Sequence, residues 1–289
     1  MTILSAHQQR PLFLRKTWDS LLAVFSLFSI TLALGGMGWI LWCVLEQGLP
    51  CLTAEFLLSP SRPYGEPGAG VANALLGTLL ITSGAALLAV PPALAAGIYL
   101  AEFGRKKRLA DILRFCANVS MGLPSILVGL FVYVLIVIPT GNFSGFAGTV
   151  SLAIIMFPVV MRTTEDMMLM VPDTLRESAL ALGMTRLRTT LCIIFRACKN
   201  GLATGILLSL ARVSGETAPL LFTVLFADTW PDHYFSEPTA SLPVLISEYT
   251  MNSPFESMHQ AGWGAALLIA LAILLLNLIT RLLFHEQRH

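Results

Sequence analysis

Two charged residues lie inside one long apolar stretch of the chain, where they could act on an ion. Arg212 and Glu216 fall within 202–226, whereas almost every other charge lies between such stretches. A charged side chain near the centre of a bilayer costs about 3 kcal/mol or more, so a partner must offset this cost. A spacing of four residues places both side chains on one face of a helix, where they can pair. The pair is either a structural device that holds helices together or part of an ion path in which Arg212 meets an anion.

The ion-path hypothesis gives a role to each polar residue near this pair. An arginine presents a planar fork of donors to an oxyanion and stays protonated. Glu216 would neutralise Arg212 when the path is empty and so weaken its hold on the anion. Ser209, three residues before Arg212, could add a hydroxyl, although a serine in a membrane helix more often bonds to its own backbone. Thr217, which follows Glu216, completes the predicted path residues.

The composition indicates a membrane protein built from helices. Hydrophobic residues make up 55% of the 289 residues and charged residues only 12%, against about 25% charged in ordinary soluble domains. The apolar stretches do not alternate with polar residues, so the spans should be helices and not the strands of a barrel. We expect an all-α fold with six transmembrane helices, at about 21–45, 71–99, 114–138, 145–163, 202–227 and 261–284.

Several classes of function are disfavoured by the sequence. The net charge of +1 gives no nucleic-acid footprint. The five cysteines show no C-x-x-C spacing and the five histidines are scattered in tails and loops, so neither a metal site nor an enzyme active site is predicted. The phosphate-binding pattern G-x-x-x-x-G-K-[ST] is absent, so the chain should not hydrolyse ATP by the usual route. We expect no cofactor in this chain.

The basic residues fall on one side of the predicted membrane. They are numerous in the segments on that side, whereas loop 46–70 contains only Arg62 and loop 227–260 contains no Lys or Arg. The positive-inside rule then predicts that both termini are cytoplasmic. The first span is longer than the core of a signal peptide, about 7–15 residues, and should be a retained anchor. The chain divides into a cytoplasmic tail (1–20), an anchor helix with an outer loop (21–65), a transmembrane domain (66–285) and a second cytoplasmic tail (286–289).

The segment 162–200 is the one large cytoplasmic loop of this topology. Thr174 and Glu177 have the spacing of a capping box, which predicts that a helix starts here. Leu175, Ala179 and Leu182 would line one face of that helix. Gly183 can adopt the left-handed conformation that ends a helix, and Thr185 could cap the next one, running through Arg196. The product is either a helical hairpin on the membrane surface or a docking helix for a cytoplasmic partner.

The same segment resembles a signature of ABC importer permeases. Glu177, Ser178 and Ala179, followed after three residues by Gly183, are similar to the E-A-A-x-x-x-G motif, with Ser178 in place of the first alanine. The resemblance implies a cytoplasmic coupling helix that fits a cleft on a separate ATPase subunit.

Other segments narrow the resemblance to one branch of these permeases. The stretches 97–105 (GIYLAEFGR), 123–133 (LPSILVGLFVY), 162–165 (RTTE) and 211–222 (ARVSGETAPLLF) resemble the A-type permease subunits of phosphate-specific ABC importers. The resemblance implies the type I ABC importer permease (MetI-like) fold, and a multi-pass location in the bacterial inner membrane. It also implies five kinds of partner or ligand: a second, C-type permease, a dimer of ATP-binding subunits that hold ATP and magnesium, a periplasmic phosphate-binding protein, inorganic phosphate and the lipid bilayer.

Three alternatives stay open at this point. The permease could carry another oxyanion, such as phosphonate, sulfate or molybdate. A secondary anion transporter would also explain an intramembrane Arg–Glu pair, but it would not explain the coupling-helix motif. The aromatic residues of loop 227–260 form either an interfacial belt or a docking surface for a binding protein.

Overall fold

The computed structural model describes residues 12–66, 68–105 and 107–283, and the regular elements in this part of the chain are all helical. The long helices are α1 (Leu12–Gly48), α3 (Ala72–Ile98), α7 (Gly145–Leu169), α10 (Phe195–Ser214) and α13 (Glu256–Leu283). The shorter ones are α2 (Ala54–Leu58), α4 (Arg108–Gly122), α5 (Ser125–Val132), α6 (Ile138–Thr140), α8 (Asp173–Ala181), α9 (Arg186–Thr189), α11 (Ala218–Thr223) and α12 (Leu242–Ser247). Wider π-helical turns continue four of these helices, at Tyr99–Phe103, Tyr133–Val137, Thr190–Ile194 and Glu248–Asn252.

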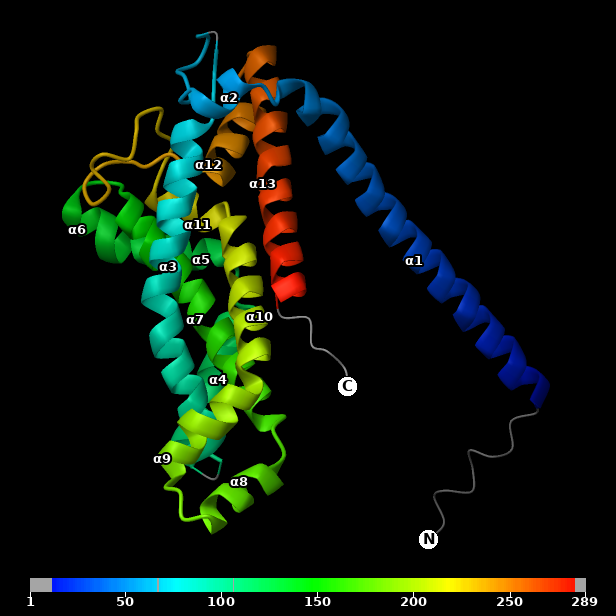
Figure 1. The fold of residues 1–289 in the computed structure, drawn as a ribbon. Helices are drawn as coiled ribbons and strands as arrows, with labels where there is room; N and C mark the ends of the chain where they lie inside the picture. Colours follow the sequence, from blue (N-terminus) through cyan, green and yellow to red (C-terminus); the bar gives the residue numbers. More distant parts are fainter. Residues whose placement is uncertain (1–11, 67, 106, 284–289) are drawn as a thin grey trace.

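The predicted all-α membrane architecture is confirmed. Within the described residues, five helical segments are long and apolar enough to cross a membrane, and they become six if one bent pair counts as a single span. The five are Lys16–Cys51, Ala72–Phe103, Gly145–Leu169, Arg186–Ser214 and Glu256–Leu282. Figure 1 shows α8 and α9 at one end of the bundle and α2 at the opposite end.

The predicted span 114–138 is present as a bent pair of helical segments. Arg108–Gly122, which is α4, and Ser125–Thr140, which begins with α5, meet at an angle of 101°. The bend lies at Pro124, whose ring disfavours a helical conformation in the residue before it. Leu123 accordingly has the extended angles φ −72° and ψ 137°.

The fifth span also differs from its predicted limits of 202–227. One helical segment runs from Arg186 through the turn Thr190–Ile194 into α10 and ends at Ser214. The chain then breaks at 215–217 before the short helix α11. Gly215 occupies the C-cap of α10, and Pro219 lies in the first turn of α11. Proline is tolerated there but would have interrupted a continuous helix.

The core of the bundle lies between α3 and α7, which pack along one another (Figure 1). Ala85, Ala89 and Ala93 of α3 are buried in the same apolar cluster as Leu152 and Met156 of α7. Small residues at such a contact let two helix backbones approach closely, which favours packing in a membrane. The Pro91-Pro92 pair does not break α3, because the helix continues to Ile98.

The first helix stands apart from the rest of the chain. Figure 1 shows α1 leaving the bundle at an angle from its contact with α13. In the apolar stretch of this span, no residue is buried within the chain. Its contact with α13 is close at Gly48, where an added Cβ would lie 2.7 Å from the Cβ of Leu267.

Replacing Gly129 by alanine should destabilise the fold. An added Cβ would lie 2.6 Å from the Cα and 2.9 Å from the carbonyl oxygen of Pro219, which are backbone atoms of α11. Overpacking of this kind typically costs about 1–3 kcal/mol. We expect a lower midpoint of thermal unfolding in detergent. Gly36→Ala in α1, where an added Cβ meets nothing within 4 Å, is the matched control. Equal midpoints for the two variants would contradict the close packing of α5 on α11.

Candidate functional site

The predicted docking helix is present as α8, with a different start from the one expected. The helix begins at Asp173 and is preceded by Pro172, without a side-chain cap. The capping-box prediction for Thr174 was therefore wrong, since Thr174 lies inside the first turn. The fixed φ of Pro172 sets the boundary, and the carboxylate of Asp173 in the first turn favours the positive end of the helix dipole.

The buried face of α8 also differs from the prediction. Arg176 and Ala179 face the body of the protein, whereas Leu175 and Leu182 are exposed. Leu182 is the C-cap of the helix, so it cannot continue the helical stripe that includes Ala179. Glu177 and Ser178 are exposed, which leaves most of the motif open to a partner. An arginine occupies the inward face because carboxylate and carbonyl groups surround it there.

The glycine elbow after α8 is confirmed. Gly183 has φ +80°, a left-handed conformation that most side chains resist. Its amide donates to the carbonyl of Leu180 (3.0 Å), and the amide of Met184 donates to that of Ala179 (3.2 Å). The hydroxyl of Thr185 accepts from the amide of Arg188 and caps the next helix, as expected. That helix runs through Arg196 without interruption.

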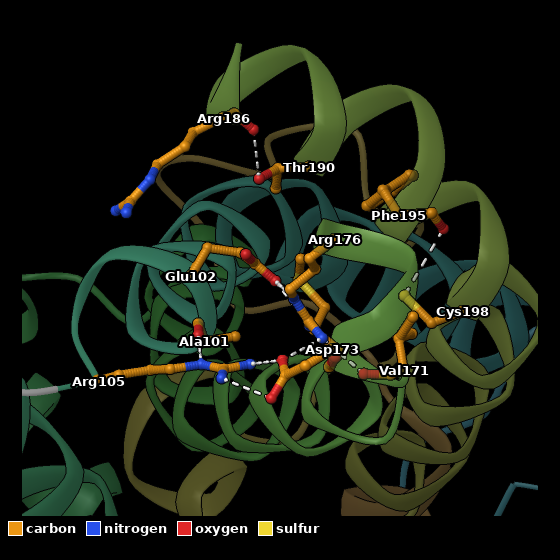
Figure 2. Close-up of polar contacts among 11 residues, drawn as sticks. Ala101, Glu102, Arg105, Val171, Asp173, Arg176, Arg186, Thr190, Phe195 and Cys198 are labelled. Carbon is orange, nitrogen blue, oxygen red and sulfur yellow. Dashed lines mark hydrogen bonds and ion pairs between the residues drawn. The ribbon is translucent and has the colours of Figure 1, made fainter. Parts of the chain in front are cut away.

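A buried arginine joins α8 to the rest of the bundle (Figure 2). The Nε and Nη2 atoms of Arg176 donate to Oε1 of Glu102 at 2.9 and 2.8 Å. Nη1 donates to the carbonyl of Val171 (2.5 Å), and Nη2 donates to that of Met168 (2.7 Å). The two charged side chains are only 11% and 12% exposed. Charge-assisted hydrogen bonds of this kind are about twice as strong as neutral ones.

A second, exposed pair lies beside this contact. Arg105 donates through Nη2 to Oδ1 of Asp173 at 3.1 Å and through Nη1 to Oδ2 at 3.3 Å. The hydrogen bond from Arg105 lowers the pKa of the Asp173 carboxyl below its ordinary value, and the positive charges of Arg105 and Arg176 add to this effect. Sequence reasoning included Glu102 only as part of a resemblance, and Arg105 only there and among the basic residues that set the topology. The signal that it missed was the opposite charge of the residues in two segments on one side of the predicted membrane. These are Glu102 and Arg105 after the second span, and Asp173 and Arg176 after the fourth.

The structure brings Arg212 and Glu216 together, although not on one helix. Nε of Arg212 lies 3.7 Å from Oε1 of Glu216. Arg212 is in the last turn of α10, whereas Glu216 lies in the break that follows. The expectation of a pair on one helix face was wrong because α10 ends at Ser214. A cation in the last turn of a helix favours its negative end, so the helix itself supports Arg212.

The other predicted path residues are placed differently. Ser209 is buried, and its Oγ has no hydrogen-bond partner in the part of the chain that the structure describes. The side chain of Arg212 is 57% exposed, so Ser209 and Arg212 face different surroundings. Thr217 is half-buried at the start of α11, where its carbonyl accepts from the amide of Leu220.

A second buried carboxylate was missed by the sequence reasoning. Glu165 of α7 is 1% exposed and accepts from Arg114 Nε of α4 (2.6 Å) and from Arg162 Nη1 (2.9 Å). Arg114 also donates to the carbonyl of Leu100 (3.2 Å). These contacts hold α4 against α7 and the end of α3. In the described residues, no group of three or more His, Cys, Asp or Glu side chains could hold a metal ion.

Comparison with known proteins gives matches to both sequence and fold. Residues 93–286 match the family described as binding-protein-dependent transport system inner membrane component. The chain is 41% identical over 285 residues to the phosphate transport system permease protein PstA of Haemophilus influenzae, covering 99% of this chain and 100% of that one. It is 40% identical to the Yersinia pestis protein of the same name over 275 residues, which are 95% and 92% of the two chains. It is 38% identical to PstA 1 of Mycobacterium tuberculosis strain H37Rv, covering 93% and 88%.

The fold is similar to that of solved structures with little sequence likeness. Two structures of the MetNI methionine ABC transporter in inward-facing conformations match with TM-scores of 0.61 and 0.62 at 15% identity. Each match covers 74% of this chain and 94% of the other. The likeness confirms the predicted MetI-like fold.

Proposed function

The chain belongs to the family of binding-protein-dependent transport system inner membrane components, and from this membership we propose that it is the transmembrane permease subunit of an ATP-driven importer of inorganic phosphate. The observation that carries the proposal is the 41% identity to a phosphate permease over 99% of this chain and 100% of the relative. The match therefore includes both α8 and the segment of Arg212 and Glu216.

The energy for transport comes from a separate subunit in this proposal. A dimer of ATP-binding subunits holds ATP and magnesium and docks on α8. The exposed side chains of Glu177 and Ser178, and the exposed Leu175 and Leu180 beside them, support this assignment. The left-handed Gly183 follows the end of α8 and turns the chain toward α9. A periplasmic phosphate-binding protein delivers the substrate on the other side.

The exposure of Arg212 supports a second permease as the next partner. Its side chain is 57% exposed in the single chain, and a guanidinium facing lipid would be costly. A C-type permease on this surface would enclose Arg212 in a path between the two subunits. Phosphate would then meet a cation that is already held by the end of α10 and by Glu216.

Glu216 has a defined task in such a path. Its side chain is only 18% exposed and lies 3.7 Å from Arg212, beyond a normal hydrogen-bond distance for this pair. The carboxylate would compensate the cation in the empty path without occupying all of its donors. An arriving phosphate can then take the free donors of the fork. Ser209 and Thr217 remain candidate path residues, although the burial of Ser209 makes it the weaker one.

The complex of this chain with its partners, reconstituted into proteoliposomes, should show phosphate-stimulated ATP hydrolysis. Substrate delivered by the binding protein should raise the ATPase rate, because loaded binding protein favours the conformation that closes the ATPase dimer. The measurement is the release of product from ATP in proteoliposomes with phosphate, sulfate, molybdate or a phosphonate. Stimulation by one of the other three anions and none by phosphate would identify a different oxyanion importer. Uptake without any ATPase subunit would identify a secondary transporter.

Substitutions at Arg212 and Glu216 can show whether Arg212 binds the anion or whether the pair only holds helices together. If Arg212 meets the anion, Arg212→Gln should abolish phosphate uptake while the complex still assembles. Arg212→Lys should restore uptake only in part, since an ammonium lacks the planar fork. A purely structural pair predicts a lower level of assembled protein in Arg212→Gln, because the mostly buried carboxylate of Glu216 would lose its partner.

The deciding variant carries both Arg212→Gln and Glu216→Gln. Uptake per assembled complex should stay lost in this variant if Arg212 binds phosphate. Recovery of both protein level and uptake would contradict the path hypothesis and leave the pair as a packing device.

The orientation of the chain in the bacterial inner membrane is testable by labelling. The charge distribution predicts cytoplasmic termini, with 227–260 outside and α8 inside. In a chain whose five cysteines are replaced by serine, Ser236→Cys should react with an impermeant thiol reagent added to intact cells, and Arg188→Cys should not. Both positions are exposed, so access depends on the side of the membrane. The opposite labelling pattern would invert the topology.

A further inference from the structure

The coupling helix α8 is joined to the bundle covalently at both ends and also through side chains. Residues 170–172 join it to α7, and the covalent route at its other end leads through residues 182–185 into α9 and α10. The side-chain route leads from Arg176 to Glu102 in the turn that ends α3. We infer that the Arg176–Glu102 contact is the link by which movement of α8 reaches the end of α3. This inference rests on the proposed function, in which an ATPase moves α8.

The side-chain route has the properties of a stiff connection. Every nitrogen atom of the Arg176 guanidinium donates a hydrogen bond. The acceptors are the carboxylates of Glu102 and Asp173 and the carbonyls of Met168 and Val171. Because the side chains of Arg176 and Glu102 are nearly buried, water does not screen their attraction as it does at the surface. The carbonyls belong to the end of α7 and the segment before α8, so one side chain joins three parts of the fold.

The covalent route has the properties of a hinge. Gly183 is in the left-handed conformation, and an added Cβ there would meet nothing within 4 Å. Leu182 is exposed and belongs to none of the apolar clusters of the described residues. The cap of the next helix is a single weak hydrogen bond of 3.4 Å from the amide of Arg188 to Thr185 Oγ1. A push on α8 can therefore bend this elbow, and it reaches α10 only through the packing of α8 on α9 and on the turn Thr190–Ile194.

The receiving end of the side-chain route is embedded in the core. Glu102 lies in the π-helical turn Tyr99–Phe103, whose Leu100 and Ala101 are fully buried. The carbonyl of Leu100 accepts from Arg114 of α4, so displacement of this turn acts on α3 and α4 together. A π-helical turn contains one residue more than an α-turn and is frequent at functional sites. The turn can absorb or pass on a small displacement by changing its hydrogen-bond register.

The chain contains a matched control for this link. Arg105 and Asp173 join the same two segments, but their side chains are 41% and 61% exposed. Exposed ion pairs contribute little because water and salt screen them. Replacing Arg105 should therefore change coupling much less than replacing either buried partner, although the two contacts lie side by side (Figure 2).

The test measures phosphate uptake and ATP hydrolysis in the same proteoliposomes of the complete complex. Arg176→Lys keeps the charge but cannot satisfy four partners, and Glu102→Gln removes the charge while it keeps the size. For both variants we expect the ratio of phosphate transported to ATP hydrolysed to fall about tenfold, within the usual range for coupling between sites. Arg105→Gln should keep the ratio of the unaltered complex to within about twofold.

The outcomes distinguish a link from a merely structural contact. A structural contact would lower the amount of assembled complex and leave the ratio per complex unchanged, which would overturn the inference. An equal fall in all three variants would also overturn it, since the exposed pair would then matter as much as the buried one. Absence of phosphate-stimulated hydrolysis in the unaltered complex and in Arg105→Gln would instead count against the proposed function.

A second measurement on the unaltered complex avoids variants that fail to assemble. Amide hydrogen exchange compares the complex without nucleotide and with ATP bound. The link predicts that exchange changes in Tyr99–Phe103 when ATP closes the ATPase dimer. Change confined to residues 182–194, with none in Tyr99–Phe103, would show that the covalent route carries the movement and would overturn the inference.

Discussion

The end of the bundle that carries α8 depends on the rule that a guanidinium cannot be buried without partners. Arg176 satisfies it with a carboxylate of one segment and two carbonyls of another, so the ends of α3 and α7 and the start of α8 must be placed correctly together. Glu165 acts in the same way on α4 and α7. The opposite end is held by apolar packing around Leu245 and Tyr249 and by hydrogen bonds between the buried, uncharged residues Asn73 and Ser61. The protein thus uses buried charges where an ATPase is proposed to act and uncharged contacts where a binding protein is proposed to dock.

The features that could be predicted from the sequence are those with local causes. Span number follows from the length and hydropathy of each stretch, which act on that stretch alone. The elbow at Gly183 and the cap at Thr185 follow from the conformational and hydrogen-bonding preferences of single residues. For the same reason, α8 was expected close to its observed position even though Pro172 rather than Thr174 marks its start.

The features that could not be predicted depend on contacts between distant segments. The 101° bend between α4 and α5 places α5 against α11, and a proline alone is compatible with a straight, kinked or broken span. The inward position of Arg176 required Glu102, which lies 74 residues earlier. Periodicity favoured the leucines because it assumes an apolar environment on the buried face. The candidate path pair was found from its charges, but the helix end between its members came from Gly215 and Pro219 acting together.

The isolation of α1 has a consequence for how this protein can diverge. A helix whose apolar stretch has no buried residue in its own chain is constrained there mainly by length and hydrophobicity, so many exchanges among apolar residues should be nearly neutral in that stretch. In α3 and α7 the same exchanges would alter a close contact between helices. Drift should therefore accumulate faster in α1 than in the helices of the bundle. The oldest shared ancestry of these permeases is then best traced through the bundle rather than through the anchor.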